Sequence, residues 1–245
     1  MSERRPEVSI AIPAYGRPLQ LAQAIESVLA QSFDDLELVI SDDGGDAEEL
    51  ARSYGDPRVR YLANPTRLGM AANWEAALER SRGRYVGLLM DDDRLLPGYV
   101  ETLHGVLERH ADVGIAFANH LFDRDGELEP RPELIAPGLH RDILLTLVRF
   151  NPVPICSTLF RRDVVARLLP LPDTHTADFI MMMRAALARV AFFYVAEPLM
   201  IYRVHGEQLS GRPEFRQQVL DMWERFDFPA ESEVARVHRE TPMWH

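Results

Sequence analysis

Apolar residues in the first half of the chain occur in short runs that alternate with stretches of helical periodicity. The runs cover residues 8–15, 36–43, 59–65, 85–93 and 113–122. Between the first two runs, the i, i+3, i+4 spacing of an amphipathic helix relates Leu21, Ala24, Ile25, Val28 and Leu29. A second helix of this kind is expected over residues 69–81, with Trp74 and Leu78 in the core. The alternation predicts an α/β fold in which helices flank a mostly parallel sheet.

The pattern becomes less regular after about residue 123. Residues 140–150 and 176–190 have helical periodicity, and residues 190–204 have the composition of a strand. Amphipathic helical spacing near the end relates Phe215, Val219, Met222, Trp223 and Phe226. This helix is expected to dock on the domain, with another subunit or a membrane surface as alternatives. We therefore interpret the chain as one domain in three parts, residues 1–122, 123–212 and 213–245.

Composition supports one large globular domain, because 47% of the 245 residues are hydrophobic. No apolar stretch approaches the roughly 20 residues of a membrane span, and the first residues lack the apolar core of a signal peptide. We expect a cytoplasmic protein with no transmembrane segment, and peripheral attachment to a membrane stays open. The net charge of −11 argues against a nucleic-acid partner, because phosphate-backbone binding relies on clustered positive charge.

All 27 basic residues are arginine, and the absence of lysine excludes several kinds of chemistry. A Schiff base, a pyridoxal-phosphate attachment, a P-loop and a kinase site would each need a lysine. The missing G-x-G-x-x-G, G-x-S-x-G and H-E-x-x-H motifs argue against Rossmann oxidoreductases, α/β-hydrolases and zinc peptidases. The single cysteine, Cys156, is expected to be a buried structural residue, since it has no second thiol to pair with.

Aromatic and acidic side chains gather where three of the apolar runs end. These ends are Pro13-Ala14-Tyr15, Asp42-Asp43 and Asp91-Asp92-Asp93. Ligands of open parallel sheets bind beyond the carboxyl ends of the strands, so these residues predict a ligand site. Three adjacent carboxylates repel one another, and a divalent cation would offset that repulsion. The alternative is a solvated acidic turn that caps the helix beginning near Pro97.

Six segments stand in a fixed order along the chain: VSIAIPAYGRP, QSFDDLELVISDDGGD, NPTRLGMAANWEAAL, GRYVGLLMDDDRLLPG, TADFIMMMR and YRVHGEQLS. Together they resemble the family 2 glycosyltransferases over about residues 8–210. The resemblance implies a single glycosyltransferase A type domain with a Rossmann-like, mostly parallel sheet. It also implies a nucleotide-diphosphate-sugar donor, a divalent cation and inversion at the anomeric carbon. Residues 1–122 would then bind the nucleotide sugar, while residues 123–212 would bind the acceptor and supply the catalytic base.

The resemblance assigns the nucleobase to the ends of the first two strands. Pro13 and Tyr15 match positions that line the nucleobase pocket, with Ala14 between them, and Asp43 matches the acidic residue that hydrogen-bonds the base. An aromatic face can stack on a pyrimidine, and a carboxylate can accept a hydrogen bond from the ring N–H. The structural alternatives are a packing role for Tyr15 and a turn-capping role for Asp43.

The resemblance places basic residues near the donor diphosphate. Arg17 and Arg67 match positions that face the diphosphate, and Arg203 and His205 match positions near the diphosphate or metal. In a chain without lysine, arginine has to bind the phosphates, and its planar fork suits phosphate oxygens. The alternative for each arginine is an ordinary surface position, and for His205 a structural one.

The aspartate triplet matches the D-x-D motif of the family, whose metal bridges the donor phosphates. The usual spacing to the following proline puts the last motif aspartate on Asp92 and the first motif position on Met90, which departs from the family pattern. Asp92 is therefore the first choice of metal ligand. Asp91 and Asp93 are alternates in direct contact or through water, and Asp91 is also counted among the donor-binding residues. Mn²⁺ or Mg²⁺ suits oxygen ligands and phosphates.

Asp178 matches the catalytic acidic residue of the family. An inverting transfer needs a base within reach of the acceptor hydroxyl, on the sugar face opposite the leaving nucleotide. The family usually has an acidic residue just before this position, whereas this chain has Ala177. Helix capping is the alternative role for Asp178.

These observations predict an inverting, non-processive transfer of a sugar from a UDP or dTDP type donor to an acceptor hydroxyl. The Q-x-x-R-W motif and the membrane spans of processive members are absent. The acceptor stays open among a small molecule, a lipid-linked intermediate, a glycan and a peptide. One alternative is a non-catalytic nucleotide-sugar-binding protein or partner subunit. The other is a metal-dependent nucleotidyltransferase, whose phosphate loop does not fit residues 13–18.

Overall fold

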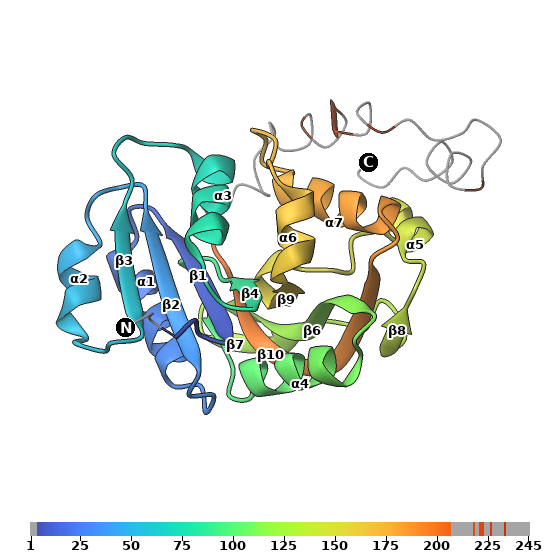
Figure 1. The fold of residues 1–245 in the computed structure, drawn as a ribbon, viewed down its shortest axis with the longest axis horizontal. Helices are drawn as coiled ribbons and strands as arrows, with labels where there is room; N and C mark the ends of the chain where they lie inside the picture. Colours follow the sequence, from blue (N-terminus) through green and yellow to red (C-terminus); the bar gives the residue numbers. More distant parts are fainter. Residues whose placement is uncertain (1–3, 207–217, 219–220, 223–225, 227–232, 234–245) are drawn as a thin grey trace.

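The computed structural model describes residues 4–206 together with residues 218, 221, 222, 226 and 233. The sheet and the helices given below fall within this part of the chain (Figure 1). The helix expected from Phe215 to Phe226 falls mostly outside it, because Phe215, Val219 and Trp223 are not described. The proposed third part, residues 213–245, lies largely outside it for the same reason.

One ten-stranded sheet organises the described residues, in the order β3-β2-β1-β4-β9-β6-β10-β5, with β7 paired to β6 and β8 paired to β10. The strands are β1 (Val8–Ala14), β2 (Leu36–Asp42), β3 (Val59–Ala63), β4 (Tyr85–Leu88), β5 (Arg94–Leu95), β6 (Val113–Arg124), β7 (Glu127–Pro130), β8 (Gly138–His140), β9 (Thr158–Arg161) and β10 (Ala191–Val204). The helices are α1 (Pro18–Leu29), α2 (Glu48–Ser53), α3 (Met70–Arg80), α4 (Tyr99–Arg109), α5 (Leu144–Arg149), α6 (Arg162–Leu168) and α7 (Ala177–Leu187), with a 3₁₀ turn at Ile155–Ser157.

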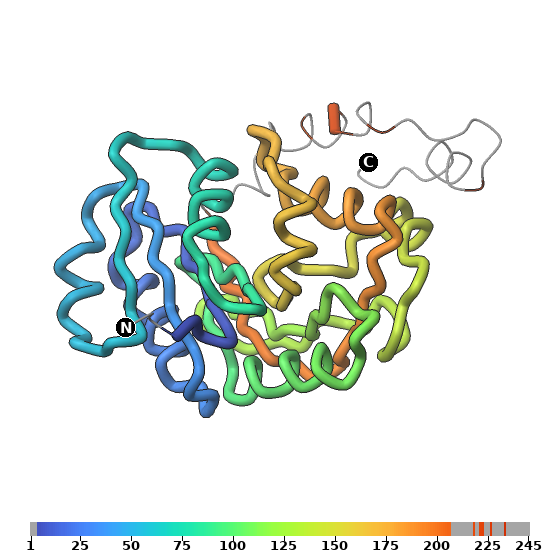
Figure 2. The backbone as a smooth tube through the Cα atoms, viewed as in Figure 1, coloured from blue at the N-terminus to red at the C-terminus, as the bar shows by residue number. Residues whose placement is uncertain are grey.

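The strands that carry the predicted site run parallel to one another. β1 pairs in parallel with both β2 and β4, and β2 pairs in parallel with β3. β9 then enters antiparallel between β4 and β6, and β10 runs parallel to β6. Because β9 and β10 come from the second half of the chain, both halves build one sheet (Figure 2). The expected α/β fold with a Rossmann-like sheet is confirmed.

Helices cover both faces of this sheet, as expected for strands whose residues are buried on both sides. On one face, α3, α6 and α7 pack over a cluster that includes Trp74, Phe117 and Phe160. On the other face, α1 and α4 pack over a cluster that includes Ile25 and Leu103. The predicted core positions are confirmed: Trp74 is 9% exposed, Leu78 2% and Cys156 3%.

Two predicted elements are shorter than the pattern suggested. β4 ends at Leu88, so residues 91–93 lie on a turn, closed by a hydrogen bond from Asp93 N–H to the Met90 carbonyl at 3.2 Å. The helix expected over 140–150 forms only at Leu144–Arg149, because His140 belongs to β8 and pairs with β10.

Candidate active site

The ends of three neighbouring strands bring the predicted residues together. β1, β2 and β4 are adjacent and parallel, so their carboxyl ends share one edge of the sheet. The chain leaves β1 through Tyr15, β2 through Asp43 and β4 through the aspartate triplet. The C-terminal end of β10 arrives at the same edge and adds Arg203 and His205. This is the position that ligands occupy in open α/β sheets.

Asp91 links the end of β4 to the end of β1. Its Oδ2 accepts the Tyr15 N–H at 2.9 Å, and its Oδ1 accepts Nη1 of Arg17 at 3.0 Å. Burial raises the pKa of Asp91 to about 6, with the neighbouring Asp92 charge acting in the same direction and the two donors acting against it. Asp91 therefore holds the segment that carries Tyr15 and Arg17 in place.

Asp92 lies between a guanidinium and an imidazole. Its Oδ2 is 2.9 Å from Nη1 of Arg17 and 3.0 Å from Nε2 of His205. The Asp92 side chain is 14% exposed and that of His205 is 25% exposed, so both reach the surface of the site. Among the described residues this is the point where the triplet, Arg17 and the end of β10 meet.

Asp92 and His205 suit a divalent cation. Two ligands at adjacent corners of an octahedral ion with bonds of about 2.1 Å stand about 3.0 Å apart, and the Asp92 and His205 ligand atoms have this separation. Carboxylate oxygen and imidazole nitrogen both suit Mn²⁺. Such ions commonly take one or two protein ligands and complete their coordination with water and substrate phosphates. The residues present therefore fit a metal held mainly by Asp92 and His205.

Asp93 faces inward, away from Arg17. It is 2% exposed, and its Oδ1 accepts the backbone N–H of Arg203 at 3.0 Å. Its Oδ2 is buried and makes no hydrogen bond of ordinary length within the described part of the chain, where the Cys156 thiol is the neighbour of the carboxyl group. Burial, then the charge of Asp92, raises the pKa of Asp93 well above its usual range. Asp93 thus fastens β10 to the triplet, which places His205 next to Asp92.

Tyr15 and Arg67 form a second group at the same edge. The guanidinium carbon of Arg67 lies 4.4 Å from the centroid of the Tyr15 ring, a cation–π contact. Tyr15 is 47% exposed, so part of its ring remains open to a ligand. Pro13 and Ala14 are buried within β1, and the Ala14 carbonyl accepts the N–H of Asp43 at 3.0 Å. Pro13 and Ala14 thus fix the backbone position of Tyr15, the residue that follows them.

The carboxylate of Asp43 holds the loop that leads into α3. Its Oδ1 accepts the Asn64 amide at 3.0 Å and the Leu68 N–H at 2.7 Å, and its Oδ2 accepts the Gly69 N–H at 2.9 Å. Turn capping, the alternative considered for Asp43, belongs to its neighbour Asp42, which accepts the N–H groups of residues 44, 45 and 47. Asp43 is therefore joined to the same loop that carries Arg67.

Asp178 occupies the first turn of α7. Its carboxyl group is enclosed enough that burial raises its pKa to about 6, although the backbone N–H groups of Phe179 and Asp178 itself act against the rise. The preceding residue, Ala177, is fully buried and starts the helix.

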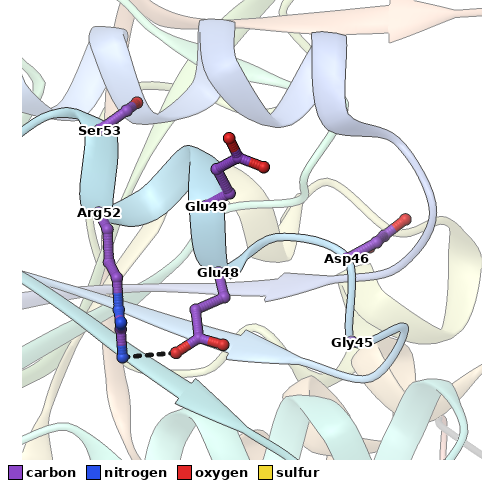
Figure 3. A pocket seen from close by; sticks show the side chains of 6 residues that line it. All are labelled: Gly45, Asp46, Glu48, Glu49, Arg52 and Ser53. Carbon is purple, nitrogen blue, oxygen red and sulfur yellow. Dashed lines mark ion pairs between the residues drawn. The ribbon is translucent and has the colours of Figure 1, made fainter.

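Two other polar groups involve none of the predicted site residues. One is a shallow depression beside α2, lined by Gly45, Asp46, Glu48, Glu49, Arg52 and Ser53 (Figure 3). Arg52 pairs there with Glu48 at 2.5 Å. The second group, Glu7, His104 and Glu108, has the spacing of metal ligands, but Arg84 already pairs with both of its carboxylates at 3.2 and 2.8 Å. We interpret both as charged surface.

Sequence reasoning missed two residues at the site. Asn73 of α3 is 3% exposed, accepts the Ser41 hydroxyl at 2.7 Å and the Asn64 amide at 2.9 Å, and so joins β2 to the loop before α3. The sequence signal was a polar residue, Asn73, next to Trp74 on the helix predicted to pack in the core. Tyr202 precedes Arg203 in the YRVH segment and was passed over because its position in space depends on β10 pairing with β6.

Comparison with known proteins agrees with this geometry. The profile of glycosyl transferase family 2 matches residues 9–169, which is more than half of the chain and includes the aspartate triplet. The chain belongs to this family. The match ends before Asp178 and β10, so the base and the His205 end of the site fall beyond the matched residues.

Relatives of this family 2 chain include named glycosyltransferases. It is 33% identical over 144 residues to the GalNAc(5)-diNAcBac-PP-undecaprenol beta-1,3-glucosyltransferase of Campylobacter jejuni, covering 56% of the chain and 45% of that protein. It is 35% identical over 132 residues to the chondroitin synthase of Escherichia coli, covering 51% of the chain and 19% of that protein. The chain thus spans less than half the length of either relative.

Solved structures share the fold of this family 2 chain at low sequence identity. The S. aureus TarS fragment 1–349 in complex with UDP-GlcNAc has a TM-score of 0.76 and 14% identity, covering 96% of the chain and 71% of that fragment. The Pyrobaculum calidifontis mannosyltransferase PcManGT, in complex with GDP-Man and Mn²⁺, has a TM-score of 0.70 and 16% identity, covering 98% of the chain and 70% of that structure's chain.

Within the described residues, no helix is both long and apolar enough to span a membrane.

Proposed function

We propose that this chain transfers a sugar from a nucleotide-diphosphate donor to an acceptor hydroxyl, with inversion and without processivity. The observation that carries the proposal is the group of Asp91, Asp92, Arg17 and His205 at the shared strand edge, with contacts of 2.9 to 3.0 Å. The names of the relatives support a sugar transfer, and the complexes of TarS and PcManGT support a nucleotide-sugar donor and a divalent ion. UDP and dTDP are the proposed carriers.

The arrangement suits a single displacement. Tyr15 would stack on the nucleobase, and Arg17 and Arg67 would face the diphosphate. Asp178 would accept the proton of the acceptor hydroxyl as its oxygen attacks the anomeric carbon. The bond from that carbon to the β-phosphate oxygen breaks, and its electron pair leaves with the nucleoside diphosphate. Charge grows on the leaving phosphate, so Arg17 stabilises the transition state more than the ground state.

The remaining roles belong to the aspartate triplet and to the end of β10. A Mn²⁺ or Mg²⁺ ion held by Asp92 and His205 would supply positive charge to the diphosphate. Asp93 would act mainly by holding β10, since its carboxyl group is buried against Arg203. Arg203 would contribute to the site through its backbone N–H, which binds Asp93. The acceptor could be lipid-linked, because the C. jejuni relative is named for such a substrate, and this is compatible with a peripheral position at a membrane.

Turnover of a panel of nucleotide sugars in the presence of Mn²⁺ tests the proposal. Release of the nucleoside diphosphate from at least one donor is expected, slowly to water and faster with an acceptor. Asp92→Asn should lower this rate by about 10²-fold or more, because a metal ligand is lost. Asp163→Asn is the matched control, since Asp163 is 76% exposed and lies in the first turn of α6, outside the predicted site residues. Equal rates for wild type and Asp92→Asn would contradict the proposed site.

A second function is a non-catalytic nucleotide-sugar-binding subunit. It is favoured by two departures from the family pattern, the partly buried Met90, which packs against both cores, and the fully buried Ala177. The same panel separates the two functions. Saturable donor binding without release of nucleoside diphosphate, for any donor and acceptor, would support the binding function over the enzyme.

A further inference from the structure

β10 brings His205 to the site and lies between two other strands, β5 and β6. The strand ends at Val204, and the next residue, His205, contacts Asp92 at 3.0 Å. On one side of β10, the partner strand β5 contains only Arg94 and Leu95. Backbone pairing on that side is therefore short, and the position of His205 depends on what else holds the end of β10.

An ion pair between the two flanking strands spans β10 at this end. Nη2 of Arg94, on β5, donates to Oδ2 of Asp123, on β6, at 2.7 Å. Adjacent strands are about 4.8 Å apart, so strands on either side of a third are separated by about 10 Å, a gap that the long arginine side chain can bridge. Arg94 and Asp123 thus connect β5 to β6 across the strand between them.

The ion pair lies on one face of β10, close to the end of the strand. Arg94 is the register partner of Ile201, and Asp123 is the register partner of Arg203. Paired residues in a sheet point to the same face, and so do residues two apart along a strand. The ion pair therefore crosses the face of β10 that carries Ile201 and Arg203, two residues before His205.

A second contact fixes the Asp123 carboxylate. Its Oδ1 accepts the N–H of Gly126 at 2.9 Å, in the two-residue turn that joins β6 to β7. Asp125 and Gly126 both have positive φ, as in the tight turns of β-hairpins. The side chains of Asp123 and Arg94 are 11% and 32% exposed, so the pair is partly shielded from water and its attraction is stronger than that of an exposed pair.

We propose that the Arg94–Asp123 ion pair positions His205 as a metal ligand by holding the end of β10 between β5 and β6. Arg94 directly follows the aspartate triplet, so the pair connects the chain that carries Asp92 to the strands that carry His205 to the site. This assignment rests on the proposed function, in which Asp92 and His205 bind the divalent cation. Without the ion pair, the two ligands would spend less time at the separation that suits the metal.

Opposite changes of charge at the two residues test the proposal. Asp123→Asn removes a negative charge and Arg94→Gln a positive one, so a purely electrostatic effect on a bound cation would weaken Mn²⁺ binding in the first variant and strengthen it in the second. Positioning predicts the same sign for both. Each variant should bind Mn²⁺ about 3- to 10-fold more weakly, less than the loss of about 10- to 100-fold that is usual for a group hydrogen-bonded directly to a metal ligand.

Mn²⁺ titrations in the presence of saturating UDP or GDP, followed by the electron paramagnetic resonance signal of free Mn²⁺, measure these affinities. A double variant with His205→Ala shows whether the pair acts through His205, because in that background Asp123→Asn should cause no further loss. In EDTA, Asp123→Asn should bind the nucleotide as wild type does. Glu129→Gln is the matched control: it breaks the exposed ion pair with Arg124 on β6, which does not span β10, and should leave Mn²⁺ affinity unchanged.

Three results would overturn this assignment and leave the proposed function in place. The first is wild-type Mn²⁺ affinity in both single variants, and the second is a change of opposite sign in the two. The third is a loss from Asp123→Asn that persists in the His205→Ala background or extends to nucleotide binding in EDTA, because that result indicates a general structural role. A wild-type chain that binds no Mn²⁺ with either nucleotide would overturn the metal site of the proposed function, and this assignment with it.

Discussion

Three consecutive aspartates are tolerated because each carboxyl group has a different environment. Asp91 accepts a backbone N–H and shares Arg17 with Asp92, and Asp92 also contacts His205. Asp93 turns inward, where burial raises its pKa and its charge is no longer presented to the site. Repulsion among like charges is therefore reduced by three contacts, with the Tyr15 N–H, Arg17 and His205, and by one inward side chain. Only Asp92 remains placed to face a ligand cation.

The pKa of Asp178 predicts the pH dependence of the transfer. A base must be ionised to accept a proton, and burial raises the pKa of Asp178 to about 6. The rate should be constant above about pH 7 and should fall about tenfold per pH unit well below pH 6. Initial rates at saturating donor between pH 4.5 and 8.5 check this. A rate that stays constant down to pH 4.5 would show that another group takes the proton.

The same raised pKa predicts that Asp178 lowers the stability of the fold at neutral pH. A carboxyl group whose folded-state pKa is raised from 3.8 to about 6 stabilises the fold below about pH 4, and this contribution is lost as the pH rises through 6. Asp178→Asn should therefore raise the free energy of unfolding at pH 8 by about 1–3 kcal/mol, while lowering turnover by about 10²–10⁴-fold. At pH 4 the stability difference should nearly vanish.

Urea unfolding of wild type and Asp178→Asn at pH 4 and pH 8 measures this difference. Asp163→Asn should change stability by less than about 0.5 kcal/mol at either pH, because its ion pair with Arg167 is exposed. A variant less stable than wild type at pH 8 would mean that the charged carboxylate makes favourable contacts in the fold, and that burial is not the dominant effect.

At the scale of elements, the loop between β3 and α3 is held mainly by Asp43. Asp43→Asn turns one of its two acceptor oxygens into a donor that meets an N–H of the loop. The loss should be about 1–3 kcal/mol of unfolding free energy, the usual effect of an unsatisfied buried group. Nucleotide affinity should fall as well, since the loop carries Arg67 over Tyr15. Thermal denaturation and nucleotide titration of the variant measure both effects.

Arg67→Ala serves as the comparison for this loop. Arg67 is exposed, so its loss should change stability by less than about 0.5 kcal/mol while weakening nucleotide binding. If Asp43→Asn instead weakened nucleotide binding with no loss of stability, Asp43 would bind the nucleobase directly, as the resemblance implies, and its loop contacts would be secondary.

Elements with a local signal were predictable from the sequence. The run from Val8 and the stripe from Leu21 to Leu29 gave β1 and α1, because periodicity depends only on neighbouring residues. The place of β9 between β4 and β6 was not predictable, since four residues carry little pattern and their pairing is set by contacts far along the chain. The strand edge could be predicted as a site from the runs themselves, whereas the meeting of His205 with Asp92 was implied only by the family resemblance, because it depends on where β10 pairs.

At the scale of the whole molecule, an acidic chain has to bind an anionic donor. The net charge is −11, so affinity for a diphosphate depends on the few cations at the strand edge and on a bound metal. Arg17 already neutralises part of Asp91 and Asp92. Without a divalent ion, the remaining carboxylate charge near the diphosphate should oppose binding.

Metal and nucleotide should therefore stabilise the fold cooperatively. A ligand at 100 times its Kd adds about 2.7 kcal/mol, which corresponds to a rise in Tm of about 5–10 °C for a chain of this size. We expect such a rise with UDP plus Mn²⁺ and a much smaller one with UDP in EDTA or with Mn²⁺ alone, by thermal denaturation. Asp92→Asn should keep the small response and lose the cooperative part, because the nucleobase contacts at Tyr15 are untouched. An equal rise in Tm with and without the metal, in wild type, would mean that arginines alone bind the diphosphate and that the triplet serves only to position them.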